Sequence, residues 1–229
     1  TLAALAFAVG MVVMAMMKPS KVASEGSKTF LKLRKEYSLF YVLAVLYGSR
    51  KQIFITFAPW VIVTVFGKPT QTIATLIVIG GVIGIIFQPL LGKAIDKLGE
   101  KTVLASEALL LVVVCLGYGF GRSVFSENTA FLVACVCYLL DQVLMSVSMA
   151  RSTYMKKIAL QASDIQSALS ASITIDHFFS IGIALIGGVI WNRFGYQSVF
   201  LFGMVIAVIN FFATMRINIP EKAAETALP

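Results

Sequence analysis

The sequence predicts an all-helical integral membrane protein, and two observations support this prediction. Hydrophobic residues make up 59% of the 229 residues, charged residues only 13%, and the mean hydropathy is +0.89, which is far from the composition of a soluble domain. In addition, the octapeptide GKAIDKLG at residues 92–99 reappears as GVIWNRFG at residues 188–195, with the shared pattern Gxxx(D/N)(K/R)xG. A connection that occurs twice between apolar segments indicates a structure that is built twice.

Seven apolar segments provide, in whole or in part, the roughly 20 residues that a membrane-spanning helix needs. They are residues 1–17, 38–66, 71–91, 102–120, 129–150, 165–191 and 196–215. The first is short and lacks the basic start and the cleavage site of a signal peptide, so we expect it to be the end of a truncated helix. We therefore predict a basic linker at residues 18–37, a six-helix domain at residues 38–217 and a tail at residues 218–229.

The basic residues predict the orientation of these segments, because loops rich in Lys and Arg stay in the cytoplasm. Fourteen of them lie in residues 18–37, in the connections after the third and fifth segments and in the tail, and only three lie in the opposite connections. The linker and the C-terminus are thus predicted to be cytoplasmic, in a multi-pass protein of the cell membrane. The net charge of +8 reflects this bias and attraction to the lipid bilayer, and no basic face interleaved with aromatic residues indicates a nucleic-acid partner.

The two copies of the repeated motif are predicted to lie on opposite faces of the membrane. Each copy joins two apolar segments, and three apolar segments separate the copies. Such a 3+3 inverted repeat is typical of secondary transporters.

A basic linker followed by six helices, with GKAIDKLGEK in the second cytoplasmic connection, resembles the C-terminal half of a major facilitator superfamily transporter. The residues that match the family signature are Gly92, Asp96, Lys97, Gly99 and Lys101. Glu100 stands where the family usually has a basic residue. The resemblance implies a 12-helix bundle in which residues 1–17 end helix 6 and residues 38–217 form helices 7 to 12. It also implies a partner outside this chain, the N-terminal six-helix half.

The signature has a physical interpretation as a cytoplasmic latch. Gly92 and Gly99 permit a tight turn and close helix approach, and Asp96 near the start of the following helix would be favoured by the helix dipole. The resemblance implies that this loop stabilises one of two access states, whereas the alternative is a short turn that only satisfies helix ends. We expect Glu107 and Arg151, also near this face, to join Asp96 in a gate network, or else to be surface charges without a specific role.

Five charged or titratable residues lie near the middle of predicted spans. They are Arg50, Lys51, Asp141, Asp176 and His177. At 1.5 Å per residue each lies about 16–20 Å from the start of its helix, so all five approach one plane. Each charge costs at least about 2.5–3.5 kcal/mol at the bilayer centre, so we expect the two cations to pair with the two carboxylates or to line a wet cavity.

We interpret this group as a substrate and proton site. Protonation of Asp141 or Asp176 would free a cationic partner and shift the balance between access states. Gln142, one residue beyond Asp141, could add a substrate contact. The alternatives are a structural salt bridge between helices and, for His177, a neutral histidine that bonds a neighbouring helix. The resemblance implies that helices 7 and 10 line the cavity, that 8 and 11 flank it, and that 9 and 12 stand outside.

The resulting hypothesis is proton-coupled transport of a small solute by alternating access. The sequence contains no HExxH, GxSxG, phosphate-binding loop or cysteine pair, so an intramembrane enzyme has no visible nucleophile or metal site, and we expect no cofactor and no metal. A membrane receptor or scaffold that transports nothing is the other alternative. It would keep the helices but would have no need of charges at mid-depth.

Overall fold

The computed structural model describes Met11 and residues 34–219. The chain divides into two units, residues 1–30 and 31–229, and Met11, which is helical and exposed, is the one described residue of the first. The predicted helix end at residues 1–17 and most of the predicted linker at residues 18–37 thus lie outside the described residues. The predicted tail is described only as far as residue 219.

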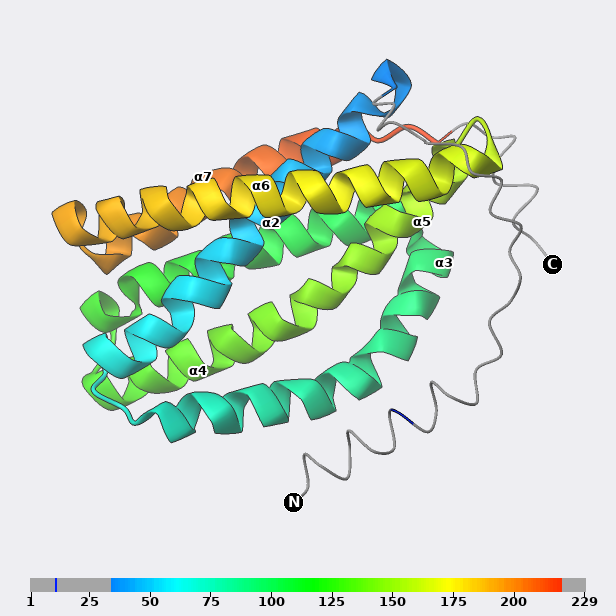
Figure 1. Ribbon diagram of the computed structural model, residues 1–229. Helices are drawn as coiled ribbons and strands as arrows, with labels where there is room; N and C mark the ends of the chain where they lie inside the picture. The colour runs from blue at the N-terminus through cyan, green and yellow to red at the C-terminus, as the bar shows by residue number, and fades with distance from the viewer. Residues whose placement is uncertain (1–10, 12–33, 220–229) are drawn as a thin grey trace. The chain divides into compact units, whose positions relative to one another are not determined.

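Helices and short helical turns, joined by short connections, make up the described residues of the second unit, and no strand occurs among those residues (Figure 1). A 3₁₀ turn, η1, precedes α2, a π-helical turn, η2, follows it, and a further 3₁₀ turn, η3, links α4 to α5. The elements are η1 Lys35–Tyr37, α2 Ser38–Trp60, η2 Val61–Val65, α3 Thr70–Val124, α4 Glu127–Leu144, η3 Met145–Val147, α5 Ser148–Ile158, α6 Ala162–Phe194 and α7 Tyr196–Met215. The all-α prediction is confirmed.

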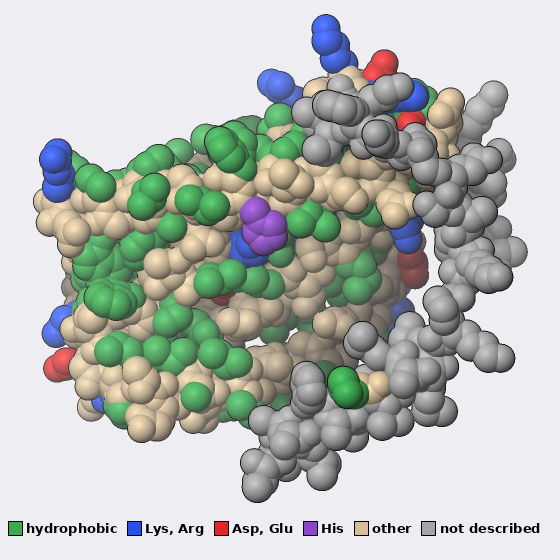
Figure 2. Space-filling model, in the orientation of Figure 1, with side chains coloured by type: hydrophobic (Ala, Val, Ile, Leu, Met, Phe, Trp, Pro, Cys, Tyr) green, Lys and Arg blue, Asp and Glu red, His purple; other side chains and the backbone are tan. Residues whose placement is uncertain are grey.

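Four of the described helices are long and apolar enough to cross a membrane: α3, the continuous helix Glu127–Ile158, α6 and α7. Hydrophobic side chains cover much of the visible surface between the two ends of the bundle (Figure 2). On α3, for example, Val78, Ile85 and Ile86 are all more than half exposed, as expected for side chains that face lipid. These helices mark a membrane-embedded protein. The element α3 contains two of the predicted spans, residues 71–91 and 102–120, which a kink at Gly99 separates.

The helix α3 reverses its direction at Gly99. Gly99 has φ 79° and ψ 159°, a conformation that is essentially restricted to glycine, and it separates an arm at residues 70–98 from an arm at residues 100–124 (Figure 1). The expected contribution of Gly92 to this turn is wrong. Gly92 lies within the first arm, and a Cβ built on it would meet nothing within 4 Å. Asp96 likewise belongs to the last turn of the first arm, so the dipole of the second arm does not explain it.

The second copy of the motif has the same backbone arrangement. Gly195 has φ 84° and ψ 169° and lies between α6 and α7, while Gly188 is inside α6 with open space around it. In both copies, therefore, the second glycine makes the turn and the first is an ordinary helical residue. The shared pattern thus corresponds to the same turn between two antiparallel helices, with a positive-φ glycine at its last position.

This difference between the two glycines of the motif predicts different effects of alanine. Gly99→Ala is expected to lower the free energy of unfolding by about 1–3 kcal/mol, because an L-residue is strained at this φ and ψ. Gly92→Ala is expected to be neutral or stabilising by up to about 1 kcal/mol, because alanine favours a helix interior. Denaturant unfolding of the purified full-length protein in detergent, followed by circular dichroism, measures both. Equal effects of the two substitutions would contradict the assigned turn.

The core beside the middle of α2 contains an aromatic cluster that joins three helices. Phe54 of α2, Tyr118 of α3 and Phe200 of α7 are all buried. The Tyr118 and Phe200 rings stack with centroids 4.8 Å apart, and Phe54 meets both rings edge-on. Aromatic pairs of this kind add stability beyond the area that they bury. They fix α2 against the second arm of α3, one turn away from Arg50.

Candidate functional site

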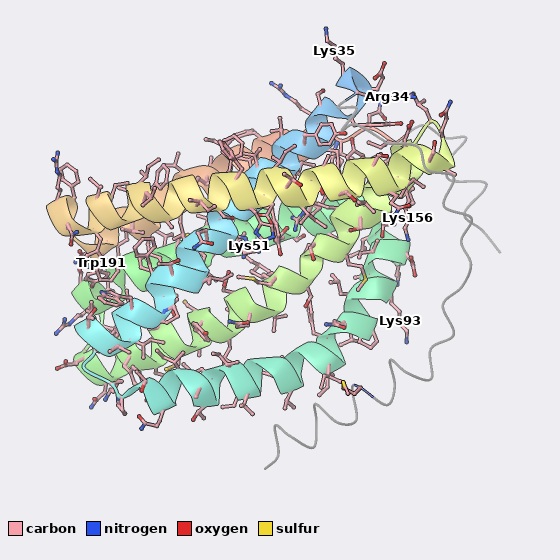
Figure 3. The ribbon with its side chains drawn as sticks, viewed as in Figure 1. Arg34, Lys35, Lys51, Lys93, Lys156 and Trp191 are labelled. Atoms are coloured by element: carbon pink, nitrogen blue, oxygen red, sulfur yellow. The ribbon has the colours of Figure 1, made fainter. Side chains whose placement is uncertain are left out.

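Two successive residues of α2 make ion pairs in two directions. Arg50 donates from Nη1 to Asp141 Oδ1 at 2.7 Å and from Nη2 to Glu107 Oε1 at 2.8 Å. Lys51, at the middle of α2 in Figure 3, donates to Asp176 Oδ2 at 2.5 Å. Successive helical positions point about 100° apart, so Arg50 faces α3 and α4 while Lys51 faces α6. The structure thus brings together the two cations and the two carboxylates that the sequence placed at mid-depth.

Glu107 also belongs to this group, which corrects its predicted place near the cytoplasmic surface. Its side chain is only 1% exposed and bridges Arg50 to Arg151, whose Nη1 is 3.4 Å from Glu107 Oε2. The second arm of α3 packs against both α4 and α7, and this packing turns Glu107 inward. The corresponding predicted helix was expected to stand outside the site. The one available signal was that Glu107 is the single acidic residue of that predicted span.

The ion cluster is electrically balanced. Its members are Arg50, Lys51, Arg151, Glu107, Asp141 and Asp176. Three cations face three carboxylates, and five of the six residues are at least nine-tenths buried. Buried charges are tolerated only when each has a partner and further hydrogen bonds. The predicted pairing of mid-depth charges is therefore present, and Glu107 and Arg151 join it as one additional acid and one additional base.

The remaining predicted site residues lie apart from the cluster. His177 is exposed (Figure 2), because it follows Asp176 directly and adjacent helical residues do not share a face. Gln142 is half-buried and packs beside Gly80 of α3. Asp96, Lys97 and Lys101 are exposed, and none of them makes an ion pair within the described part of the chain. Of the expected gate network, Glu107 and Arg151 are in contact, and Asp96 is not part of it.

A cavity of about 300 Å³ adjoins the cluster between α2, α5 and α6. Arg151 and Asp176 are its charged lining residues. The other lining side chains are those of Phe40, Ala44, Tyr47, Ser148, Ser152, Leu169, Ser172 and Ile173. They come from the first half of α2, from α5 and from the first half of α6. The cavity is therefore in the half of the bundle that contains Lys156, which is labelled in Figure 3.

Three polar contacts, two of them made by the Tyr37 hydroxyl, join segments at that same end. The Tyr37 hydroxyl donates to Asp164 Oδ2 at 2.7 Å and accepts the Leu160 backbone N–H at 3.0 Å, and burial of the phenol raises the pKa of Tyr37, so the hydroxyl keeps its proton. Glu100 is buried next to Gly99, and its Oε1 is 2.7 Å from Lys157 Nζ of α5. In the sequence, Glu100 is only a departure from the signature. The packing of α5 beside the turn brings Lys157 to it.

The opposite end of the bundle is packed by aromatic side chains. Phe57 of α2 stacks on Trp191 of α6 with ring centroids 5.8 Å apart, and Trp191 lies at the far end from Lys93 and Lys156 in Figure 3. Gly187 makes this stack possible, because a Cβ built there would be 2.5 Å from the Phe57 ring. The two ends of the α2 and α6 pair thus differ, with a polar cavity toward one end and a close aromatic contact toward the other.

No family model, curated protein or solved structure matches the chain. Within the residues that the structure describes, no group of three His, Cys, Asp or Glu side chains could hold a metal ion. The function is therefore inferred from the ion cluster, the cavity beside it and the apolar helices that hold both.

Proposed function

We propose that this chain is the C-terminal six-helix half of a major facilitator superfamily transporter, which moves a small solute by alternating access with proton coupling. One observation carries the proposal: a cavity among apolar helices has in its wall a buried carboxylate, Asp176, that is paired with the partly buried Lys51. Ionisable residues inside a membrane are costly and are typical of substrate pathways and proton relays. A receptor or scaffold would not need such a cluster.

The two aspartates have different roles in this proposal. Asp176 lines the cavity, where a proton and a solute can reach it, and its protonation releases Lys51. Asp141 is 3% exposed and is not a lining residue, so it serves to neutralise Arg50. The coupling step is therefore a change in the charge of the Asp176 and Lys51 pair, which alters the relative stability of two arrangements of α2 and α6.

The cavity and the aromatic stack lie at opposite ends of the α2 and α6 pair, which favours a state that is open on one side of the membrane and closed on the other. We propose that the cavity end, near Lys156, faces the cytoplasm, as the positive-inside rule requires, and that the stack of Phe57 on Trp191 closes the outer side. The contacts of Tyr37 with Asp164 and of Lys157 with Glu100 then lie at the cytoplasmic end, where they can open and close. In a transporter of this kind, an N-terminal six-helix half would supply the other wall of the pathway.

The coupling proposal predicts different effects of neutralising the two aspartates. In proteoliposomes containing the full-length protein and a pH-sensitive dye, Asp176→Asn is expected to lose at least about 90% of solute-driven proton flux, because no titrating carboxylate remains in the cavity wall. The folded fraction of Asp141→Asn is expected to retain proton coupling, because Asp141 does not line the cavity. Full proton-coupled transport by both variants would contradict the proposal.

A further inference from the structure

Arg151 has hydrogen-bonding capacity that its surroundings do not use. An arginine has five N–H donors. The one acceptor that Arg151 has within the described residues is Glu107 Oε2, at the long distance of 3.4 Å from Nη1, and its Nη2 is buried without any partner there. The residue is 6% exposed and lines the cavity. A buried donor without an acceptor costs about 1–3 kcal/mol or more when charged, so an acceptor supplied by a ligand would be stabilising.

The Arg151 guanidinium is also held in place. Its Cζ is 3.6 Å from the centroid of the Tyr47 ring, which is a close cation–π contact. Tyr47 itself belongs to α2 and lines the same cavity. A guanidinium fixed against an aromatic face keeps its planar array of donors, and this array matches the two oxygens of a carboxylate.

The neighbouring carboxylates cannot supply the missing acceptor without giving up stronger contacts. Glu107 already accepts from Arg50 at 2.8 Å through Oε1. In Asp176, Oδ2 accepts from Lys51 at 2.5 Å, and Oδ1 is 3.3 Å from the Ser180 hydroxyl, which shares its single proton between Oδ1 and the Gly48 carbonyl. Arg151 is therefore under-coordinated, while Glu107 Oε1 and Asp176 Oδ2 are engaged with other cations. A ligand with one negative charge would complete its coordination.

The rest of the cavity limits the size and polarity of this ligand. Its volume of about 300 Å³ is at the lower end of the range for small-molecule sites. The hydroxyls of Ser148, Ser152 and Ser172 provide short polar contacts, and the side chains of Phe40, Leu169 and Ile173 provide an apolar wall. A molecule with one anionic group and a short apolar part would fit both surfaces.

We propose that the cavity binds a small organic monocarboxylate, with its carboxylate on Arg151 and its apolar part against Phe40, Leu169 and Ile173. This rests on the proposed transport function, because it identifies the class of solute that the same site carries. A dicarboxylate binds more weakly, since its second charge meets no cation with unused donors in the lining. A cationic analogue is repelled by Arg151, while Asp176 is already neutralised by Lys51.

Isothermal titration of the full-length protein in detergent tests the ligand class with three probes: butyrate, succinate and n-butylammonium. Butyrate is expected to bind most tightly and n-butylammonium not at all. Arg151→Gln is expected to weaken butyrate binding by about 10- to 100-fold, and Arg151→Lys by less. Arg122→Gln is the matched control, because Arg122 is an exposed arginine that contacts Val65 and Glu127 away from the cavity, and it is expected to leave binding unchanged.

A second variant covers the case in which Arg151→Gln does not fold. Ile173 lines the cavity, and its side chain is 58% exposed and outside the ion pairs. The larger side chain of Ile173→Trp is expected to fill the cavity and abolish butyrate binding, while the protein still folds. Preferential binding of n-butylammonium, absence of butyrate binding, or butyrate binding that survives Ile173→Trp would each overturn the proposal.

Uptake of radiolabelled butyrate by proteoliposomes separates this inference from the transport function. Binding that depends on Arg151 without any uptake contradicts transport and leaves the carboxylate site intact. Proton-linked uptake of another solute without butyrate binding contradicts the carboxylate site and leaves transport intact. Binding and uptake that are both lost in Ile173→Trp support the two proposals together.

Discussion

Arg50→Met is expected to lower the free energy of unfolding by about 3–5 kcal/mol, the usual cost of breaking a buried ion pair from one side. Methionine keeps an unbranched apolar stem in place of the arginine, but it leaves Asp141 without its cation and Glu107 with only the 3.4 Å contact to Arg151. Asp141 is then buried without a partner, and the two carboxylates share the single cation Arg151. Chemical unfolding of the full-length protein in detergent, followed by circular dichroism, measures the loss.

Two further variants isolate the cause of this loss. Adding Asp141→Leu to Arg50→Met removes one of the stranded charges, so the double variant is expected to recover a substantial part of the stability. Arg122→Met removes an exposed arginine, 44% exposed at its side chain, and is expected to change stability by less than about 1 kcal/mol. If Arg50→Met cost no more than Arg122→Met, the cluster would have to be hydrated and its proposed electrostatic role would be wrong.

Gly48→Ala is expected to disrupt both the α2 and α6 contact and the coupling pair. A Cβ at Gly48 would overlap Asp176 Oδ1 and would lie 2.9 Å from the Asp176 backbone oxygen. The two helices approach closely here, and the Ser180 hydroxyl donates to the Gly48 carbonyl at 3.1 Å. Overpacking of this kind typically costs about 1–3 kcal/mol. Because Asp176 must move, proton-coupled transport is expected to fall together with stability.

Gly182→Ala is the matched control for Gly48→Ala. Gly182 lies on the same helix as Asp176, but a Cβ built on it meets nothing within 4 Å, so alanine is expected to preserve both transport and the unfolding free energy. Thermal unfolding and proteoliposome flux are measured for both variants. Similar behaviour of the two alanines would show that α2 and α6 are not in close contact at Gly48.

The helical class and the mid-depth charges were predictable because they depend on properties that are local in the sequence. An apolar segment of sufficient length is a candidate span whatever it packs against, and a charge within it must be compensated. The composition therefore predicted the helices, and the desolvation cost predicted that Arg50 and Lys51 would pair with Asp141 and Asp176 or line a wet cavity. The pairing occurs. The repeated motif predicted two turns, and both occur, each at its second glycine.

The partners of single side chains depended on the packing of distant segments. Glu107 lies 57 residues from Arg50, and its inward direction follows from how the second arm of α3 lies against α4 and α7. Asp176 and His177 are sequence neighbours, yet one is buried and the other is exposed, because helical rotation about the axis is set by neighbouring helices. The under-coordinated Arg151 is likewise a property of the assembled site. Spacing along one helix says which residues share a depth, whereas the rotation and approach of several helices determine which of them meet.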